Sequence, residues 1–362
     1  MKLSTKQRIG LEATRLIHKN LANEHPLRQL FWESTLRCNL NCRHCGSDCK
    51  AISGTKDMPL DDFLRVLDSI SERVDPHKVF VIVTGGEPLM RTDIEHCGRE
   101  IYRKGFPWGM VSNGLALTSG RLEGLLQAGV HTMAISLDGL HDNHNWLRRH
   151  EKSFDAVENA IDLLTHSPII DFDIVTCVTQ KNYEELPALR DFLIQKGVRK
   201  WRLFSVFPAG RAMDEPLLQL ENRQMRGLMS FIKSTREDGK IKASYGCEGF
   251  LGGYEGKVRN HFFFCNAGIT VGSVLADGSI SACASIRSDY SQGNIYKDDF
   301  MDVWEHRYGI YRKRDWMKSG ECEGCRMFRY CNGNGMHLRD DDGRLLTCHY
   351  KRLINTDVVS VD

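Results

Sequence analysis

Three cysteines in one short polar stretch constrain this chain more than any other feature. Cys38, Cys42 and Cys45 have the spacing C-x3-C-x2-C and follow the apolar, β-prone run 31–36. Three neighbouring thiols cannot pair without leaving one over, so disulfides explain them poorly. Iron–sulfur clusters and zinc both select thiolate ligands, and structural zinc normally takes four. A four-iron cluster on three cysteines would keep one iron free for a substrate or cofactor. These three residues alone do not exclude a zinc site.

The number and placement of all the cysteines also favour metal binding. The chain has 13 of them, and residues 1–8 lack the apolar core of a signal peptide. We therefore expect a cytoplasmic protein whose cysteines bind metal rather than form disulfides. Cys97 and Cys177 stand apart and are expected to be inert core residues. The others fall into three groups, at 38–49, 247–283 and 322–348.

Length and charge limit the classes of protein and partner. With 362 residues, the chain is expected to form one large domain and a smaller one. Hydrophobic residues make up 41% and charged residues 27%, as in ordinary globular proteins. The formal net charge is only +2, which gives no reason to expect nucleic acid or an anionic membrane surface as a partner. The sequence also has no run of 18 apolar residues that would span a bilayer.

Strand and helix patterns alternate through most of the chain. After an amphipathic helix within residues 1–28, six β/α units follow, and their β-branched apolar strands are typical of a parallel sheet. Right-handed crossovers would produce either a doubly wound sheet or part of a barrel, and periodicity does not separate the two. The expected strands are 31–36, 78–83, 108–111, 131–136, 172–178 and 201–206. The expected helices are 60–73, 93–104, 120–128, 154–165, 184–196 and 216–236.

The pattern changes near residue 240, where strands become short and glycine and cysteine become frequent. We place a boundary at the polar stretch 237–240. The predicted organisation is a helical lead-in at 1–28, an α/β domain at 29–238 and a cysteine-rich domain at 239–362.

The cysteine loop resembles the signature of the radical S-adenosylmethionine (SAM) enzymes. The resemblance implies a partial (β/α)6 TIM-like barrel with a 4Fe-4S cluster on Cys38, Cys42 and Cys45. In that family the free iron is chelated by the amino and carboxylate groups of SAM. His44 occupies the position where the family usually has an aromatic residue beside the adenine.

Further motifs follow the predicted strands, at the edge where parallel β/α proteins collect their functional groups. Gly85-Gly86-Glu87-Pro88 resembles the GGEP motif of the family, which binds the SAM amino group. Two glycines allow close backbone approach, and a carboxylate suits an ammonium. A plain strand–helix turn with Pro at its first helical position would explain the same residues.

The next strand ends resemble other parts of the SAM pocket. Ser112, Asn113, Ser136 and Asp138 match family positions beside the methionine and ribose, although these residue types are also common helix N-caps. The turn at 208–211 resembles one on the adenine or substrate side. The histidines at positions 141, 144 and 150 are expected in a solvated loop.

The C-terminal cysteines resemble the SPASM domain, which holds auxiliary clusters in radical SAM enzymes that modify peptides and proteins. Gly335 stands where that pattern has a cysteine of the first auxiliary cluster, and Cys247 is a candidate replacement. The first cluster would then keep an open iron. Zinc remains an alternative, because Cys322-x2-Cys325 alone is ordinary zinc-ribbon spacing. The matching cysteines are Cys265, Cys283, Cys322, Cys325, Cys331 and Cys348.

Together the resemblances imply an enzyme with three 4Fe-4S clusters, one binding SAM and two auxiliary. It would cleave SAM reductively to a 5′-deoxyadenosyl radical and abstract hydrogen from a peptide or protein, with flavodoxin or ferredoxin as electron donor. A small molecule such as a tetrapyrrole is an alternative substrate. A sulfatase-maturing enzyme is less well matched, because Ala284 stands where those enzymes carry an acidic base. A non-catalytic electron carrier would not need a SAM pocket.

Overall fold

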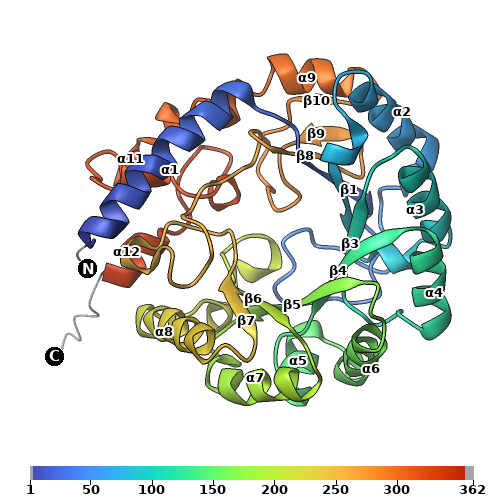
Figure 1. The fold of residues 1–362 in the computed structure, drawn as a ribbon, viewed down its shortest axis with the longest axis horizontal. Coiled ribbons are helices and arrows are strands. Elements are labelled where there is room, and N and C mark those ends of the chain that lie inside the picture. The colour runs from blue at the N-terminus through green and yellow to red at the C-terminus, as the bar shows by residue number, and fades with distance from the viewer. Residues whose placement is uncertain (1–2, 355–362) are drawn as a thin grey trace.

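The computed structural model describes residues 3–354, in which one curved sheet of ten strands forms the centre. The strand order is β10-β9-β8-β1-β2-β3-β4-β5-β6-β7; neighbours from β8 to β7 are parallel, and β9 and β10 are antiparallel. Figure 1 shows β1–β7 curving as an open barrel with helices outside. The strands are β1 (Gln29–Thr35), β2 (Phe80–Gly85), β3 (Trp108–Ser112), β4 (Val130–Ser136), β5 (Asp171–Val178), β6 (Lys200–Ser205), β7 (Lys242–Tyr245), β8 (Val271–Val274), β9 (Ser279–Ser281) and β10 (Gly293–Asn294).

The six expected β/α units are confirmed, and the partial barrel is the alternative that the chain adopts. Helices cover the strands with apolar stripes; α2, for example, buries Phe63, Val66, Leu67 and Ile70 at helical spacing. The last predicted helix begins later than expected, at Asn222, because Glu221 and Gln224 form a capping box. The helices are α2 (Leu60–Ser71), α3 (Ile94–Arg103), α4 (Ser119–Gln127), α5 (His141–Arg148), α6 (Ser153–Thr165), α7 (Leu186–Gln195) and α8 (Asn222–Asp238).

The sheet continues across the predicted boundary at 238–239. β7 extends it beyond β6, and β8 pairs in parallel with β1 at its other side, with Gln29 opposite Val271. The C-terminal segments therefore lie on the open side of the barrel (Figure 1). Their helices are α9 (Phe300–His306), α10 (Gly309–Arg312), α11 (Phe328–Cys331) and α12 (His349–Ile354).

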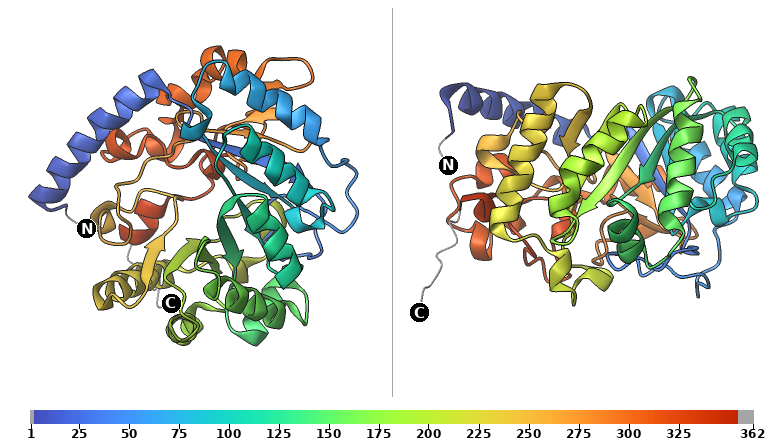
Figure 2. Two further views of the ribbon diagram at one scale, coloured as in Figure 1. Left: turned by 45° about the vertical axis from the view of Figure 1, so that its right-hand side comes forward. Right: turned by 90° about the horizontal axis from the view of Figure 1, so that it is seen from below.

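The N-terminal helix α1 (Thr5–Glu24) lies against the C-terminal region at one end of the molecule (Figure 2). Glu12 accepts a hydrogen bond from the Tyr330 hydroxyl at 2.7 Å, and Gln7 donates one to the Gly253 carbonyl at 2.8 Å. Leu11 is the one residue of α1 that is buried, so this helix buries less apolar surface than its sequence pattern predicts. No helix within residues 3–354 is long and apolar enough to cross a membrane.

A buried ion pair holds the segment that leads from β7 into the cysteine-rich region. Arg259 and Glu255 are 2.9 Å apart, with side chains 1% and 0% exposed. Arg259 also donates to the Gly246 carbonyl at 2.9 Å, and Glu255 accepts from the backbone N–H of Phe263 at 2.8 Å. The pair therefore fixes the chain on both sides of it.

We predict that Arg259→Met lowers the thermal unfolding midpoint clearly, because it leaves the Glu255 carboxylate buried without its partner. Breaking a buried pair in this way costs about 3–5 kcal/mol. As a control, Lys233→Met removes an exposed pair with Glu237 on α8, and such pairs contribute about 0.3–0.5 kcal/mol. Equal midpoints for the two variants would contradict the assigned role of Arg259.

Candidate functional site

The cysteine loop lies at the carboxyl end of β1 and forms one wall of a cavity of about 130 Å³. Ten of the twelve residues expected at the SAM site line this cavity, whereas Pro88 and Asp138 do not. Thr84 and Arg148, which the sequence analysis did not assign to the site, line it as well, as do Cys49 and Arg211, the last residue of the turn expected on the adenine or substrate side. The ten are Cys38, Cys42, His44, Cys45, Gly85, Gly86, Glu87, Ser112, Asn113 and Ser136.

The two glycines at the end of β2 hold the start of the cysteine loop. The Gly86 N–H donates to the Thr35 carbonyl at 2.7 Å, and the Glu87 N–H donates to the Arg37 carbonyl at 2.9 Å. A β-carbon on Gly85 would lie 2.1 Å from the Thr35 oxygen, and one on Gly86 would lie 2.3 Å from the Arg37 oxygen. The close approach predicted from the glycines is thus made, within the protein, to the strand that leads into Cys38.

Glu87 is buried and held by three donors. Its carboxylate accepts hydrogen bonds from the Ser112 hydroxyl at 2.9 Å, from the Asn113 N–H at 2.6 Å and from the Leu89 N–H at 3.1 Å. Burial raises the pKa of Glu87, and these bonds oppose the rise. Ser112 and Asn113 therefore have a structural role in orienting a carboxylate that lines the cavity.

Arg211, in the turn after β6, fastens the other side of the cysteine loop. Its Nε donates to the Cys42 carbonyl at 2.8 Å and its Nη1 to the Cys49 carbonyl at 3.2 Å. Its Nη2 is buried and has no hydrogen-bond partner among residues 3–354. The turn at 208–211, expected on the adenine or substrate side, thus reaches both the loop and the cavity.

Asp138 supports the site from behind through Arg148. Its Oδ2 lies 2.6 Å from Arg148 Nε, and Arg148 Nη1 lies 3.7 Å from the Cys42 sulfur. Burial acts to raise the pKa of Asp138, but Arg148, together with His44, His144 and the Cys177 N–H, more than offsets it, and the pKa stays below its usual value. Arg148 was missed in the sequence because a basic residue in the last turn of a helix is ordinary and carries no spacing signal.

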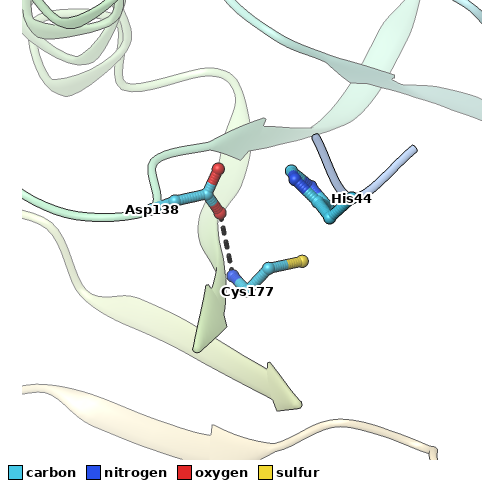
Figure 3. A group of neighbouring side chains, drawn as sticks. All are labelled: His44, Asp138 and Cys177. Carbon is cyan, nitrogen blue, oxygen red and sulfur yellow. Dashed lines mark hydrogen bonds between the residues drawn. The ribbon is translucent and has the colours of Figure 1, made fainter. Parts of the chain in front are cut away.

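His44, Asp138 and Cys177 lie together beside this ion pair (Figure 3), with their ligand-type atoms within 4.8 Å of one another. Cys177 was expected to be an inert core residue, like the buried Cys97, but it is half-buried here. Its backbone N–H donates to Asp138 at 2.8 Å, so both carboxylate oxygens are already occupied. His44 Nδ1 is buried without a partner among the described residues. We therefore assign no separate metal ion to this group, of which His44 lines the cavity and Asp138 and Cys177 do not.

The expectation of a solvated loop around the histidines is wrong for His144. This residue is 0% exposed on α5, its Nδ1 accepts from the Asp138 N–H at 3.1 Å, and its Nε2 lies 2.9 Å from the Ser153 hydroxyl. Burial lowers its pKa to about 3, so the ring is neutral. His141 begins the same helix and is exposed, as is His150 in part.

The C-terminal cysteines form two further groups. One small cavity is lined by Cys322, Cys325, Cys331 and Cys348 together. In the other group, Cys283 and Cys265 are close enough to Cys247 for their charges to raise its pKa to about 12, after burial, which is the larger cause. Cys247 is exposed, yet burial is the main cause of its raised pKa, so its thiol faces a space within the protein.

Comparison with known proteins decides the family. Residues 32–193 match the Radical SAM superfamily, and residues 265–326 match SPASM, an iron-sulfur cluster-binding domain. A protein from Pyrococcus furiosus, the tungsten-containing aldehyde ferredoxin oxidoreductase cofactor-modifying protein, is 30% identical over 310 residues, which are 79% of this chain and 83% of that protein. The chain belongs to the radical SAM superfamily. It is a radical SAM enzyme with a SPASM domain, and such domains imply iron–sulfur clusters and SAM as cofactors.

Two relatives of lower sequence identity have names that indicate other activities. An AdoMet-dependent heme synthase from Methanosarcina barkeri is 24% identical over 323 residues, covering 84% of this chain and 90% of that one. A mycofactocin maturase, MftC, from Mycolicibacterium smegmatis is 27% identical over 317 residues, covering 85% and 77%.

Solved structures share the fold of this radical SAM enzyme. The anSMEcpe enzyme with bound AdoMet has a TM-score of 0.71 at 19% identity, covering 91% of this chain and 94% of that one. SuiB from Streptococcus suis, bound to its precursor peptide SuiA, has a TM-score of 0.67 at 18% identity, covering 88% and 74%.

We predict that Gly86→Ala displaces the cysteine loop and lowers both the unfolding midpoint and the iron content of anaerobically purified enzyme. Its methyl group would overlap backbone, which cannot give way as a side chain can, so the cost exceeds the usual 1–3 kcal/mol or so of overpacking. Gly120→Ala on α4 is the matched control, because nothing lies within 4 Å of its β-carbon position. Wild-type iron content and stability in Gly86→Ala would contradict this account of the loop.

Proposed function

We propose that this radical SAM enzyme cleaves SAM with a cluster bound by Cys38, Cys42 and Cys45 and modifies a peptide or protein. The observation that carries the proposal is the single cavity shared by these three thiols and Glu87. Three soft ligands leave one iron free, and a buried carboxylate next to them suits the amino group of SAM. His44 and Arg211 line the same cavity, and each has a buried nitrogen without a hydrogen-bond partner in the described part of the chain that is available to a ligand.

The chain's residues have separable roles in this proposal. When bound together, a reduced cluster and SAM supply a 5′-deoxyadenosyl radical for hydrogen abstraction. Glu87 binds the SAM amino group, and Ser112 and Asn113 hold its carboxylate in place. His44 and Ser136 contact the remainder of SAM, while Gly85, Gly86 and Pro88 shape the turn and Asp138 orients Arg148.

Arg148 affects the proposed cluster through an N–H directed at the Cys42 sulfur. Hydrogen bonds to ligand sulfurs raise the reduction potential of iron–sulfur clusters, because they stabilise the extra negative charge of the reduced state. The Asp138 carboxylate partly offsets the guanidinium charge and fixes its direction. The pair therefore favours reduction while keeping the loop in one orientation.

For the auxiliary clusters we propose two ligand sets. Cys322, Cys325, Cys331 and Cys348 bind one complete cluster, and Arg339 Nη2 lies 3.4 Å from the Cys322 sulfur. Cys247, Cys265 and Cys283 bind the other. These clusters would accept the electron that remains after C–H cleavage, and a carrier such as flavodoxin or ferredoxin would deliver electrons to the enzyme.

A peptide or protein is favoured as substrate by the maturase relative and by the SuiB structure with its precursor peptide. The heme synthase relatives favour a second candidate, a tetrapyrrole. Absorbance separates the two, because binding of iron-coproporphyrin to the enzyme would shift its intense visible bands. A shift at micromolar concentration would support the tetrapyrrole and count against the peptide. A short precursor gene beside this one would name a peptide to test.

We predict that reconstituted enzyme releases 5′-deoxyadenosine from SAM under dithionite, and that Cys38→Ala, Cys42→Ala and Cys45→Ala each abolish this release. Liquid chromatography of anaerobic reactions measures the product. Cys97→Ala, a buried cysteine outside the three groups, should keep the wild-type rate. Release at the wild-type rate by the triple loop variant would overturn the proposed site.

A second prediction concerns the cluster count. Three cubane clusters require about twelve irons per chain, and the triple loop variant should lose about a third of them. Cys247→Ala should lose the first auxiliary cluster, keep 5′-deoxyadenosine release and lose product. Iron analysis and Mössbauer spectra of anaerobic preparations measure this. Zinc in the C-terminal sites, or unchanged iron in Cys247→Ala, would contradict the assignment.

A further inference from the structure

The place left by the missing SPASM cysteine is filled by another potential ligand. A β-carbon on Gly335 would lie 2.6 Å from Cε1 and 2.9 Å from Nδ1 of His337, and 3.0 Å from the Glu248 carbonyl oxygen. The imidazole thus occupies the direction in which a cysteine at 335 would project. Glu248, whose carbonyl lies in that direction, directly follows Cys247 in the sequence.

His337 faces an internal space, as Cys247 does. Its neighbours Met336 and Leu338 are 0% exposed, whereas His337 is partly exposed. Burial lowers its pKa to about 4, so the ring carries no charge and has a free lone pair, the form in which histidine binds metals. Within residues 3–354 its nitrogens make no hydrogen bond, and its ring contact is with Phe207 at 5.0 Å between centroids. An imidazole that lines a space within the protein with both nitrogens unbonded is free to bind a ligand.

We propose that His337 is the fourth protein ligand of the first auxiliary cluster, completing the set of Cys247, Cys265 and Cys283. The inference rests on the proposed assignment of those three cysteines. It replaces the expectation of an open iron at this cluster, because a donor nitrogen stands where the sequence pattern shows only glycine. The signal in the sequence is weak, since the histidine follows Cys331 at x5 rather than x3 spacing.

An imidazole ligand has a direct consequence for the cluster. Neutral nitrogen in place of thiolate removes one negative charge from the ligand set, and this raises the reduction potential, as in clusters where histidine replaces cysteine. The first auxiliary cluster would then be the easier of the two to reduce. It would be suited to take an electron from a substrate and would not bind that substrate directly.

The alternative role for His337 is a free base that faces the substrate, and the test separates the two. The loop triple variant Cys38→Ala/Cys42→Ala/Cys45→Ala retains only the auxiliary clusters. This protein is prepared with 15N-histidine and with 14N-histidine, reduced with dithionite and measured by pulsed EPR. We expect a directly coordinated nitrogen coupling that changes with the isotope and disappears in His337→Ala. His306→Ala, an exposed histidine on α9, is the control and should keep the coupling.

A second variant protects the test against simple loss of the cluster. Gly335→Cys/His337→Ala restores the family cysteine, and the Gly335 φ of −70° permits it once the ring is removed. The Glu248 carbonyl, 3.0 Å from the β-carbon position, must then move slightly. This variant should keep the iron, lack the nitrogen coupling and show a lower auxiliary potential. A full auxiliary cluster without nitrogen coupling in the parent protein overturns the ligand assignment for His337. Absence of iron from the C-terminal sites instead overturns the proposed function on which it rests.

Discussion

The hydrogen-bonded contact between the ends of β1 and β2 is the constraint on which the rest of the site depends. Parallel pairing continues past the strands, where the N–H groups of Gly86 and Glu87 donate to Thr35 and Arg37. One short contact therefore places the cysteine loop and the Glu87 carboxylate relative to each other. The distance between the proposed cluster ligands and the proposed SAM-binding carboxylate is then set by the rigid sheet and does not depend on loop packing.

Buried arginines recur beside the proposed ligand groups. Arg148 lies behind Cys42, Arg339 behind Cys322, and Arg314 donates to the Cys265 carbonyl at 2.8 Å. Each is at most 7% exposed. Thiolate ligands bring negative charge into the protein interior, and a guanidinium, which stays charged when buried, offsets that charge at fixed donors. A buried arginine thus offsets the negative charge of thiolate groups at three places in the protein.

The sequence predicted which residues line the cavity better than it predicted their contacts. Spacing singles out Cys38, Cys42 and Cys45, because candidate ligands on one loop leave a pattern that is independent of the fold. It does not identify Arg148 or His337, which reach their neighbours only through tertiary structure.

Fold prediction had similar limits. Strand and helix periodicity predicted the six β/α units, since that pattern is local. The pairing of β1 with β8 joins residues about 240 positions apart, and no local pattern predicts it. His144 shows the opposite error: a polar cluster suggested solvent, whereas two hydrogen bonds within the protein satisfy a fully buried ring.

The position of β8 beside β1 also affects the order of folding. β1 emerges early in synthesis, yet one of its edges stays without a partner until residues 271–274 have been made. Long-range parallel pairing is slow to form, and an unpaired edge strand can join a strand of another chain. The nascent barrel is therefore prone to aggregation just next to the cysteine loop. Slow completion of this edge would limit the yield of folded protein in fast overexpression, even when iron and sulfide are plentiful.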